Sequence, residues 1–358
     1  ILLSIGVKLG VPWLINPIIG GLALSGTFFL ARDMFNGKVA RLVVILGLVS
    51  PFFRMMSSIF MSHAAAILWV VIAMRMLWLC GKYPERSGLV RPITAGIALG
   101  FLYITRPQAG AVTMPLLILW VIWKFRIRFW RSAMLFVVPL VCFYGFLGFY
   151  NSRLTGDFNT NPRYFVDPGR SLGFGDDLGE PLPGGGRSGH DLKRGLKNAR
   201  LLLSLFNAEL LGWGAWGVMG WFSFLTIVAG IKYRKDIRFW IMLSGILLNM
   251  FLYIFYFTPS PNFGPRYLAE VIPAGLIISA LGISVIFDLA VKNLGTDQAT
   301  SLVSTTVLFL IVFSLIVTVP LHTYHYGVLP ETLDQSRIPK TTGSAIVLIP
   351  SELQRMNT

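Results

Sequence analysis

Long apolar runs recur along nearly the whole of this 358-residue chain. A helix needs about 20 apolar residues to cross a bilayer, where no water is present to satisfy an open backbone. Apolar side chains make up 54% of the chain and charged ones only 13%, which is unusually few for a soluble protein. The sequence therefore predicts an all-α integral membrane protein.

About ten of these runs are predicted as transmembrane helices once their ends are extended. They cover residues 11–31, 42–57, 62–80, 92–105, 108–123, 133–151, 212–231, 239–258, 268–288 and 301–321. One long loop separates the sixth run from the seventh. We divide the chain into membrane helices at 1–151, a loop at 152–211, membrane helices at 212–322 and a tail at 323–358.

Lysine and arginine are concentrated in alternate short loops between the runs. The basic residues of these loops are Arg32, Lys38 and Arg41; Lys82, Arg86 and Arg91; Lys124, Arg126, Arg128 and Arg131; and Lys232, Arg234, Lys235 and Arg238. Loops rich in Lys and Arg stay on the cytoplasmic side, so the loop at 152–211 and the tail are predicted to be extracytoplasmic. The net charge of +15 does not gather on one surface, and we expect no nucleic-acid partner.

The second half of the long loop has the pattern of an amphipathic helix. Its apolar residues at helical spacing are Leu192, Leu196, Ala199, Leu203, Phe206 and Leu210, and its basic ones are Lys193, Arg194, Lys197 and Arg200. Such a helix lies in the membrane interface, where each basic residue attracts anionic lipid by about 1 kcal/mol. Simple anchoring and a specific site for a lipid phosphate both remain open.

Polar residues gather at those ends of the runs that are predicted to face outward. They are Arg54, His63, Arg106, Asn151, Asp157, Arg266, Tyr267 and Glu270. Arg266 and Glu270 are four apart, so on a helix they share a face and could pair. Each residue also has a structural interpretation, as a cap, a turn residue or a snorkelling arginine. Together they would suit a cavity for a phosphorylated lipid, because arginine binds phosphate oxygens in bidentate geometry.

Several short motifs follow one another in an order typical of one enzyme family. They are Asn16-Pro17, Ala31-Arg32-Asp33-Met34-Phe35, Ser50-Pro51-Phe52-Phe53, Met61-Ser62-His63, Gly96-Ile97-Ala98-Leu99-Gly100 with Thr105-Arg106-Pro107, Tyr150-Asn151 with Thr155-Gly156-Asp157, and Gly264-Pro265-Arg266-Tyr267 with Pro273. In these the chain resembles the type-C fold glycosyltransferases, especially bacterial relatives of dolichyl-phosphate-mannose protein mannosyltransferases and lipid A aminoarabinose transferases. The resemblance implies transfer of a sugar from a polyprenyl-phosphate carrier to a lipid, glycan or protein acceptor. It also implies a bacterial inner membrane and a site facing the periplasm or exterior.

The resemblance also assigns roles to individual residues. Arg266 and Arg106 would contact the carrier phosphate, while His63, Tyr267 and Glu270 would line the cavity or orient the arginines. Other residues predicted at the cavity are Asn151, Asp157 and Arg54. The catalytic carboxylate of the family lies in the first outer loop, so we expect it upstream of Ile1 in a longer chain. We predict no metal ligands and no definite cofactor, and leave open a need for a divalent cation.

Two other functions are consistent with the pattern. A lipid-linked sugar flippase or transporter would need charged residues deep in its spans and broken helices in matched halves. Arg75 is the one charge clearly inside a predicted span, and it lies toward the cytoplasmic end. A catalytically inactive assembly subunit is the third alternative. The gathering of polar residues at one face favours the enzyme.

Overall fold

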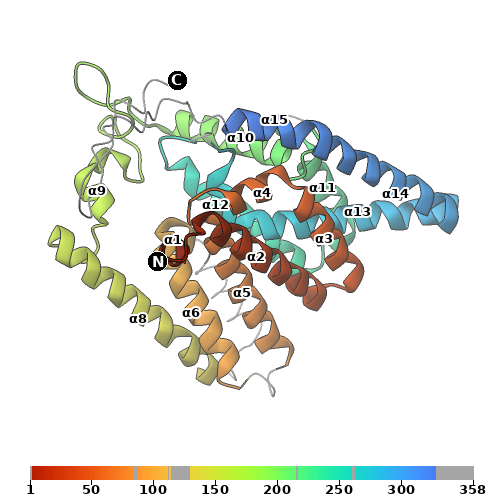
Figure 1. The fold of residues 1–358 in the computed structure, drawn as a ribbon, viewed down its shortest axis with the longest axis horizontal. Coiled ribbons are helices and arrows are strands. Elements are labelled where there is room, and N and C mark those ends of the chain that lie inside the picture. Colours follow the sequence, from red (N-terminus) through yellow and green to blue (C-terminus); the bar gives the residue numbers. More distant parts are fainter. Residues whose placement is uncertain are drawn as a thin grey trace.

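A computed structural model describes residues 2–83, 88–111, 113, 130–214, 217–259 and 263–327, and its regular elements there are all helices (Figure 1). The first group is α1 (Leu2–Lys8), α2 (Pro12–Met34), α3 (Gly37–Val49), α4 (Pro51–Ser58), α5 (His63–Lys82), α6 (Val90–Thr105) and α8 (Trp130–Thr155). Two short helices in the long loop, α9 (Pro162–Val166) and η3 (Pro168–Arg170), precede α10 (Leu192–Glu209). The last group is α11 (Trp221–Tyr233), α12 (Ile237–Ile254), η4 (Arg266–Val271), α13 (Ile272–Leu294), α14 (Thr296–Phe313), η5 (Ser314–Thr318) and α15 (Val319–Gly327). The all-α membrane fold predicted from the sequence is confirmed.

Six helical segments in the described part of the chain are long and apolar enough to cross a membrane. They are Pro12–Met34, His63–Lys82, Met134–Thr155, Ile237–Ile254, Arg266–Leu294 and Thr296–Tyr324. The pair α3 and α4, bent by 66°, brings the number to seven if it counts as one span. The helices α6 and α11 are apolar but shorter. The predicted number of ten spans is not established, and most of the run at 108–123 lies outside the described residues.

Two predicted spans are interrupted for local reasons. The run at 42–57 breaks at Ser50, whose hydroxyl accepts the Phe53 N–H, and Pro51 then opens α4. The run at 212–231 becomes helical only at Trp221. Gly212 and other glycines of that stretch have positive φ, whereas helix residues need negative φ. The helix α11 therefore begins later than the apolar run does.

The helices form two packed groups. In one, α2, α5, α6 and α8 lie side by side in that order, with α8 at the edge (Figure 1). In the other, α13 packs against α3, α11, α12 and α14. Within an apolar 18-residue stretch of each segment, 61% of the residues in Arg266–Leu294 are buried, against 22% in Met134–Thr155. The helix α13 is therefore central and α8 peripheral. Between the groups, η4 contacts both α5 and α12.

Several basic loops meet at one end of the molecule. Arg75 Nε donates to Asp33 Oδ2 at 2.9 Å, and Lys82 Nζ donates to the Asp33 carbonyl at 3.2 Å. Arg238 Nη1 donates to the carbonyl of Met34. Three loops predicted to be cytoplasmic are therefore joined. The charge of Arg75 is balanced by Asp33, and His63 lies at the opposite end of α5 from this cluster.

The helix predicted at 192–210 is present as α10, but its faces differ from those predicted. Leu192 and Leu196 are 57% and 52% exposed. The buried face instead carries Gly195 and Asn198, and Asn198 Nδ2 donates to the carbonyls of Tyr256 and Phe257 at 3.2 and 3.1 Å. Apolar residues of this helix face both the protein and the surroundings, which a hydropathy pattern does not separate. The basic residues Lys193, Arg194, Lys197 and Arg200 are exposed, so their interfacial role stays a prediction.

Candidate functional site

A largely buried arginine links three separate segments of the chain. Arg106 follows α6, and its Nε lies 2.6 Å from Oε1 of Glu270 in η4. Its Nη1 contacts Nδ1 of His63, the first residue of α5. The side chains of Arg106 and Glu270 are 12% and 1% exposed. The predicted residues His63, Arg106 and Glu270 are therefore brought together.

The partner of Glu270 differs from the one that spacing suggested. The carboxylate pairs with Arg106 because η4 is a 3-10 helix, and Leu268 within it has non-helical backbone angles. With three residues per turn, residues four apart do not share a face, so the spacing of Arg266 and Glu270 does not favour the predicted pair. Neither oxygen of Glu270 accepts a well-aligned hydrogen bond from a described residue, so the contact with Arg106 is an ion pair and acceptor capacity remains.

Local sequence explains how these side chains are positioned. Pro107 disfavours helical backbone at Arg106, which is extended (φ −145°, ψ 83°) and ends α6. Asn16 Nδ2 donates to the carbonyls of Ile59 and Met61, which fixes the turn before His63. Gly264 has φ of 69°, and a Cβ there would lie 2.1 Å from Oε2 of Glu209. The left-handed backbone and this close approach both favour glycine at the turn into η4.

Arg266 lies against an aromatic wall next to the buried pair. Its guanidinium carbon is 5.5 Å from the centre of the Tyr267 ring, a cation–π distance. The Tyr267 ring stacks on Tyr253 at 4.7 Å and meets Tyr256 edge-on at 5.4 Å. Arg266 and Arg106 both act electrostatically on His63. Arg266 and Tyr267 thus belong to the same site as His63.

The long loop contributes residues that sequence reasoning missed. Arg163 Nη2 donates to the hydroxyl of Tyr256 at 3.2 Å, and Gln108 Nε2 donates to the hydroxyl of Tyr164. Burial raises the pKa of both Tyr164 and Tyr256. The signal for α9 was Asn161-Pro162, an N-cap followed by a first-turn proline. The helix α9 thereby lies against the site.

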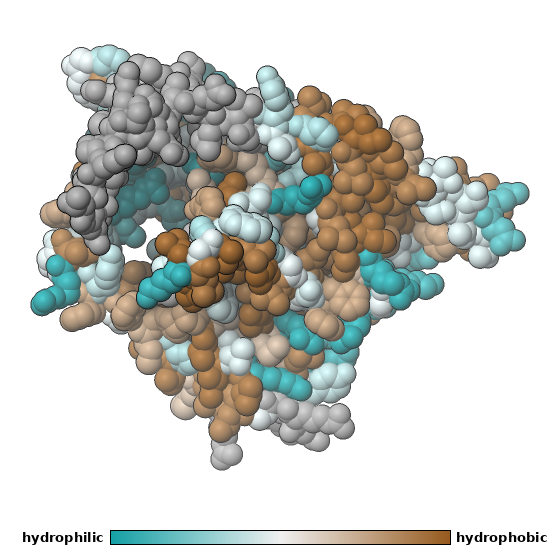
Figure 2. Space-filling model, in the orientation of Figure 1, coloured by the Kyte–Doolittle hydropathy of each residue, from teal (hydrophilic) through white to brown (hydrophobic). Residues whose placement is uncertain are grey.

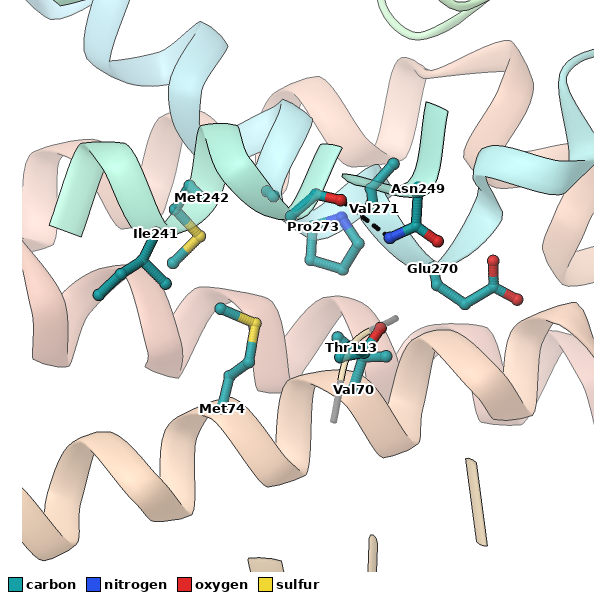
Figure 3. A pocket seen from close by; sticks show the side chains of 11 residues that line it. Val70, Met74, Thr113, Ile241, Met242, Asn249, Glu270, Val271 and Pro273 are labelled. Atoms are coloured by element: carbon teal, nitrogen blue, oxygen red, sulfur yellow. Dashed lines mark hydrogen bonds between the residues drawn. The ribbon is translucent and has the colours of Figure 1, made fainter. Parts of the chain in front are cut away.

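A crevice leads from the apolar interior to Glu270. Figure 3 shows Glu270 and Asn249 at one end of it and Ile241, Met242 and Met74 toward the other. Asn249 Nδ2 donates to the Gly245 carbonyl at 2.8 Å, while its Oδ1 has no hydrogen-bond partner in the described part of the chain. The crevice holds only about 30 Å³, so it does not accommodate a lipid chain.

Three predicted site residues lie elsewhere. Asn151 is buried and its Nδ2 donates to the Phe158 carbonyl at 3.3 Å. The Thr160 hydroxyl donates to Asp157 and holds the pKa of that carboxyl below its usual value. Both residues shape the turn after α8. Arg54 is exposed and lines a groove between α4 and α15.

The described residues contain no group of three or more His, Cys, Asp or Glu side chains that could hold a metal. A need for a divalent cation was left open by the sequence and is not tested by this geometry. Glu270, the carboxylate at the centre of the site, is engaged by Arg106. The other polar side chains of the site belong to arginines, a histidine and tyrosines.

Comparison with solved structures identifies the fold. The chain is similar to the oligosaccharyltransferase of Archaeoglobus fulgidus (TM-score 0.51, 14% identity over 88% of this chain and 44% of that one). It is also similar to ArnT from Cupriavidus metallidurans (TM-score 0.50, 15% identity over 91% of this chain and 60% of that one). No model of a known protein family matches the chain, and no curated protein matches it by sequence.

Both similar structures are membrane glycosyltransferases of the type-C fold. The chain has this fold, as its sequence motifs predict, and spans 44% and 60% of the lengths of the two structures. At such low identity the similarity establishes the fold and leaves the reaction to be argued from the site.

Proposed function

We propose that this chain forms the membrane-embedded site of a glycosyltransferase that takes a sugar from a polyprenyl-phosphate carrier. The acceptor would be a lipid, a glycan or a protein. The observation that carries the proposal is the largely buried Arg106, held between Glu270 and His63 beside Arg266. This arrangement occurs in a fold shared with membrane glycosyltransferases.

The charges of the site suit a leaving phosphate. Negative charge develops on the carrier phosphate as the sugar bond breaks, and prearranged guanidinium groups stabilise that charge. Glu270 fixes the orientation of Arg106, and Arg266, which also acts electrostatically on His63, is the second proposed phosphate contact. Arg163, at the edge of the site, has no carboxylate partner among the described residues and adds a third guanidinium.

The aromatic wall supports a role in holding the donor. Tyr253 and Tyr256 are buried and contact the Tyr267 ring in stacked and edge-on geometry, while Tyr267 and the nearby Tyr164 are partly exposed. Such rings offer an apolar face to a sugar or prenyl unit and a hydroxyl to a polar group. We assign no catalytic base, because Glu270 is engaged by Arg106.

The orientation is part of the proposal. The clusters around Asp33 and Arg238 place several basic loops at the end of the molecule opposite His63. By the positive-inside rule that end is cytoplasmic, and the site faces the periplasm or exterior. The exposed basic residues of α10 would then contact lipid headgroups at the same surface.

The test is sugar transfer by the full-length protein in membranes. The donors are short-chain polyprenyl phosphates that carry a radiolabelled hexose or pentose. We expect Arg266→Gln to abolish cleavage of the donor while the protein stays folded and inserted. The control is Arg153→Gln, since Arg153 is exposed on α8 and takes no part in the site.

Full donor cleavage by Arg266→Gln would show the assignment to be wrong. Transport of intact lipid-linked sugar across proteoliposomes, without cleavage by the unmodified protein, would instead identify a flippase. Donor cleavage that needs a second protein would point to an assembly subunit.

A further inference from the structure

A groove distinct from the Arg106 site opens between α4 and α15. Its walls are Pro51, Arg54, Met55, Ser58 and Ile59 on one side and Val319, His322 and Thr323 on the other. It holds about 250 Å³. Pockets that enclose a whole drug-sized ligand hold roughly 300–1,000 Å³, so this groove suits a headgroup instead.

Arg54 gives the groove its charge. The side chain is exposed, and no described residue forms an ion pair or hydrogen bond with it. A guanidinium with its donors unused can bind a phosphate in bidentate geometry. Thr323 adds a hydroxyl on the facing wall. The apolar side chains of Met55, Ile59 and Val319 fill much of the remaining lining.

The facing wall is anchored to the protein interior. His322 Nε2 lies 3.0 Å from Oε2 of Glu209, and the two side chains are 8% and 4% exposed. A carboxylate that bonds one ring nitrogen fixes the orientation of the imidazole. Glu209 also contacts the turn at Gly264 that leads into η4. The groove is therefore preformed and shares structural support with the Arg106 site.

The groove adjoins a hydrocarbon-facing surface. Only 6% of an apolar 18-residue stretch within Thr296–Tyr324 is buried, and Figure 2 shows a continuous hydrophobic surface over this part of α14 and α15. Its exposed apolar residues near the groove are Val312, Leu315, Ile316 and Leu321. A lipid whose phosphate lay at Arg54 could place its chain along this surface.

We propose that the groove between α4 and α15 binds the phosphate of a membrane lipid, with Arg54 as its principal contact. The chemistry fits two sources: the polyprenyl-phosphate carrier and an anionic phospholipid. The proposal rests on the groove alone and does not depend on the glycosyltransferase activity.

Native mass spectrometry of the full-length protein in mild detergent tests the proposal. The probes are a short-chain polyprenyl phosphate, phosphatidylglycerol and inorganic phosphate. We expect Arg54→Gln to lose one bound lipid, with affinity at that site at least about tenfold weaker, as for one charge-assisted contact. Arg153→Gln, which changes an exposed arginine away from the groove, should bind as the unmodified protein does.

The probe that responds identifies the ligand. If Arg54→Gln loses binding of the polyprenyl phosphate alone, the ligand is the carrier. If it loses binding of phosphatidylglycerol alone, the ligand is a structural phospholipid. Unchanged binding of both lipids by Arg54→Gln overturns the proposal, and so does inorganic phosphate that binds as tightly as the lipids. Arg266→Gln should keep this site, so failure here and failure of the proposed function are separable.

Discussion

The ion pair between Arg106 and Glu270 makes a quantitative prediction about stability. The charged atoms are 2.6 Å apart and the carboxylate side chain is 1% exposed. Glu270→Gln removes the negative charge and leaves the guanidinium buried without compensation, as Arg106→Gln does to the carboxylate. Breaking a buried pair in this way costs about 3–5 kcal/mol, roughly 10² to 10³-fold or more in the folding equilibrium. We expect each single substitution to show a loss of this size.

A double-mutant cycle separates the pair from its surroundings. Unfolding is followed by circular dichroism in mixed micelles with increasing sodium dodecyl sulfate, for both single variants and for Arg106→Gln with Glu270→Gln. Because the second substitution removes the stranded charge, the double variant should be at least about 2 kcal/mol more stable than additivity predicts. Asp33 and Arg75 provide a matched pair at 2.9 Å with 14% and 26% exposure, where about 1 kcal/mol is expected.

Additive losses at Arg106 and Glu270 would refute the argument, because they would mean that neither charge depends on the other. Equal coupling in the two pairs would also refute it, since the larger value is derived from burial alone.

Two further predictions concern the surroundings of the site. Gly264→Ala should destabilise the protein by about 1–3 kcal/mol, because the backbone there is left-handed and the added Cβ would clash with Glu209. Gly295 has a similar φ but open space around it, so Gly295→Ala should lower the stability less in the same unfolding assay. Because burial raises the pKa of Tyr256, its phenol should stay protonated above the usual value of about 10. The ultraviolet absorbance of the unmodified protein and of Tyr256→Phe is followed as the pH rises, and the difference between the two titrations reports Tyr256 alone. Ionisation of Tyr256 near pH 10 would contradict the predicted rise in its pKa.

The sequence predicts the helices well and the partners of polar residues less well. Apolar runs are sufficient for the fold class, because a bilayer leaves few alternatives to the helix. The meeting of His63, Arg106, Arg266 and Glu270 also follows from alternating spans, which place these residues at one end. Which arginine pairs with Glu270 depends on the 3-10 geometry of η4, and that is a property of the tertiary contacts around it.

Other parts of the site carry no distinct sequence signal. Tyr253 lies within an apolar run, where a tyrosine is unremarkable until its ring is seen against Tyr267. Arg163 lies in a loop rich in turn residues, and its contact with Tyr256 spans 93 positions of sequence. In α10, Asn198 and Glu209 are polar yet buried, whereas a sequence pattern assigns polar residues to the exposed face of a helix.

Ion pairs form at both ends of the molecule. At the basic end, Arg75, Lys232 and Arg238 each have a carboxylate partner, namely Asp33, Asp288 and Asp236. At the other end, Arg106 pairs with Glu270, and Arg170 and Arg187 pair with Asp167. Arg54 and Arg163 have no carboxylate within reach in the described part of the chain. A cation at a hydrocarbon boundary is costly unless an anion or water accompanies it. Arg54 and Arg163 each lie beside a site or groove, and under the two proposals above that anion would be a lipid phosphate, which has the charge and the membrane location to accompany them.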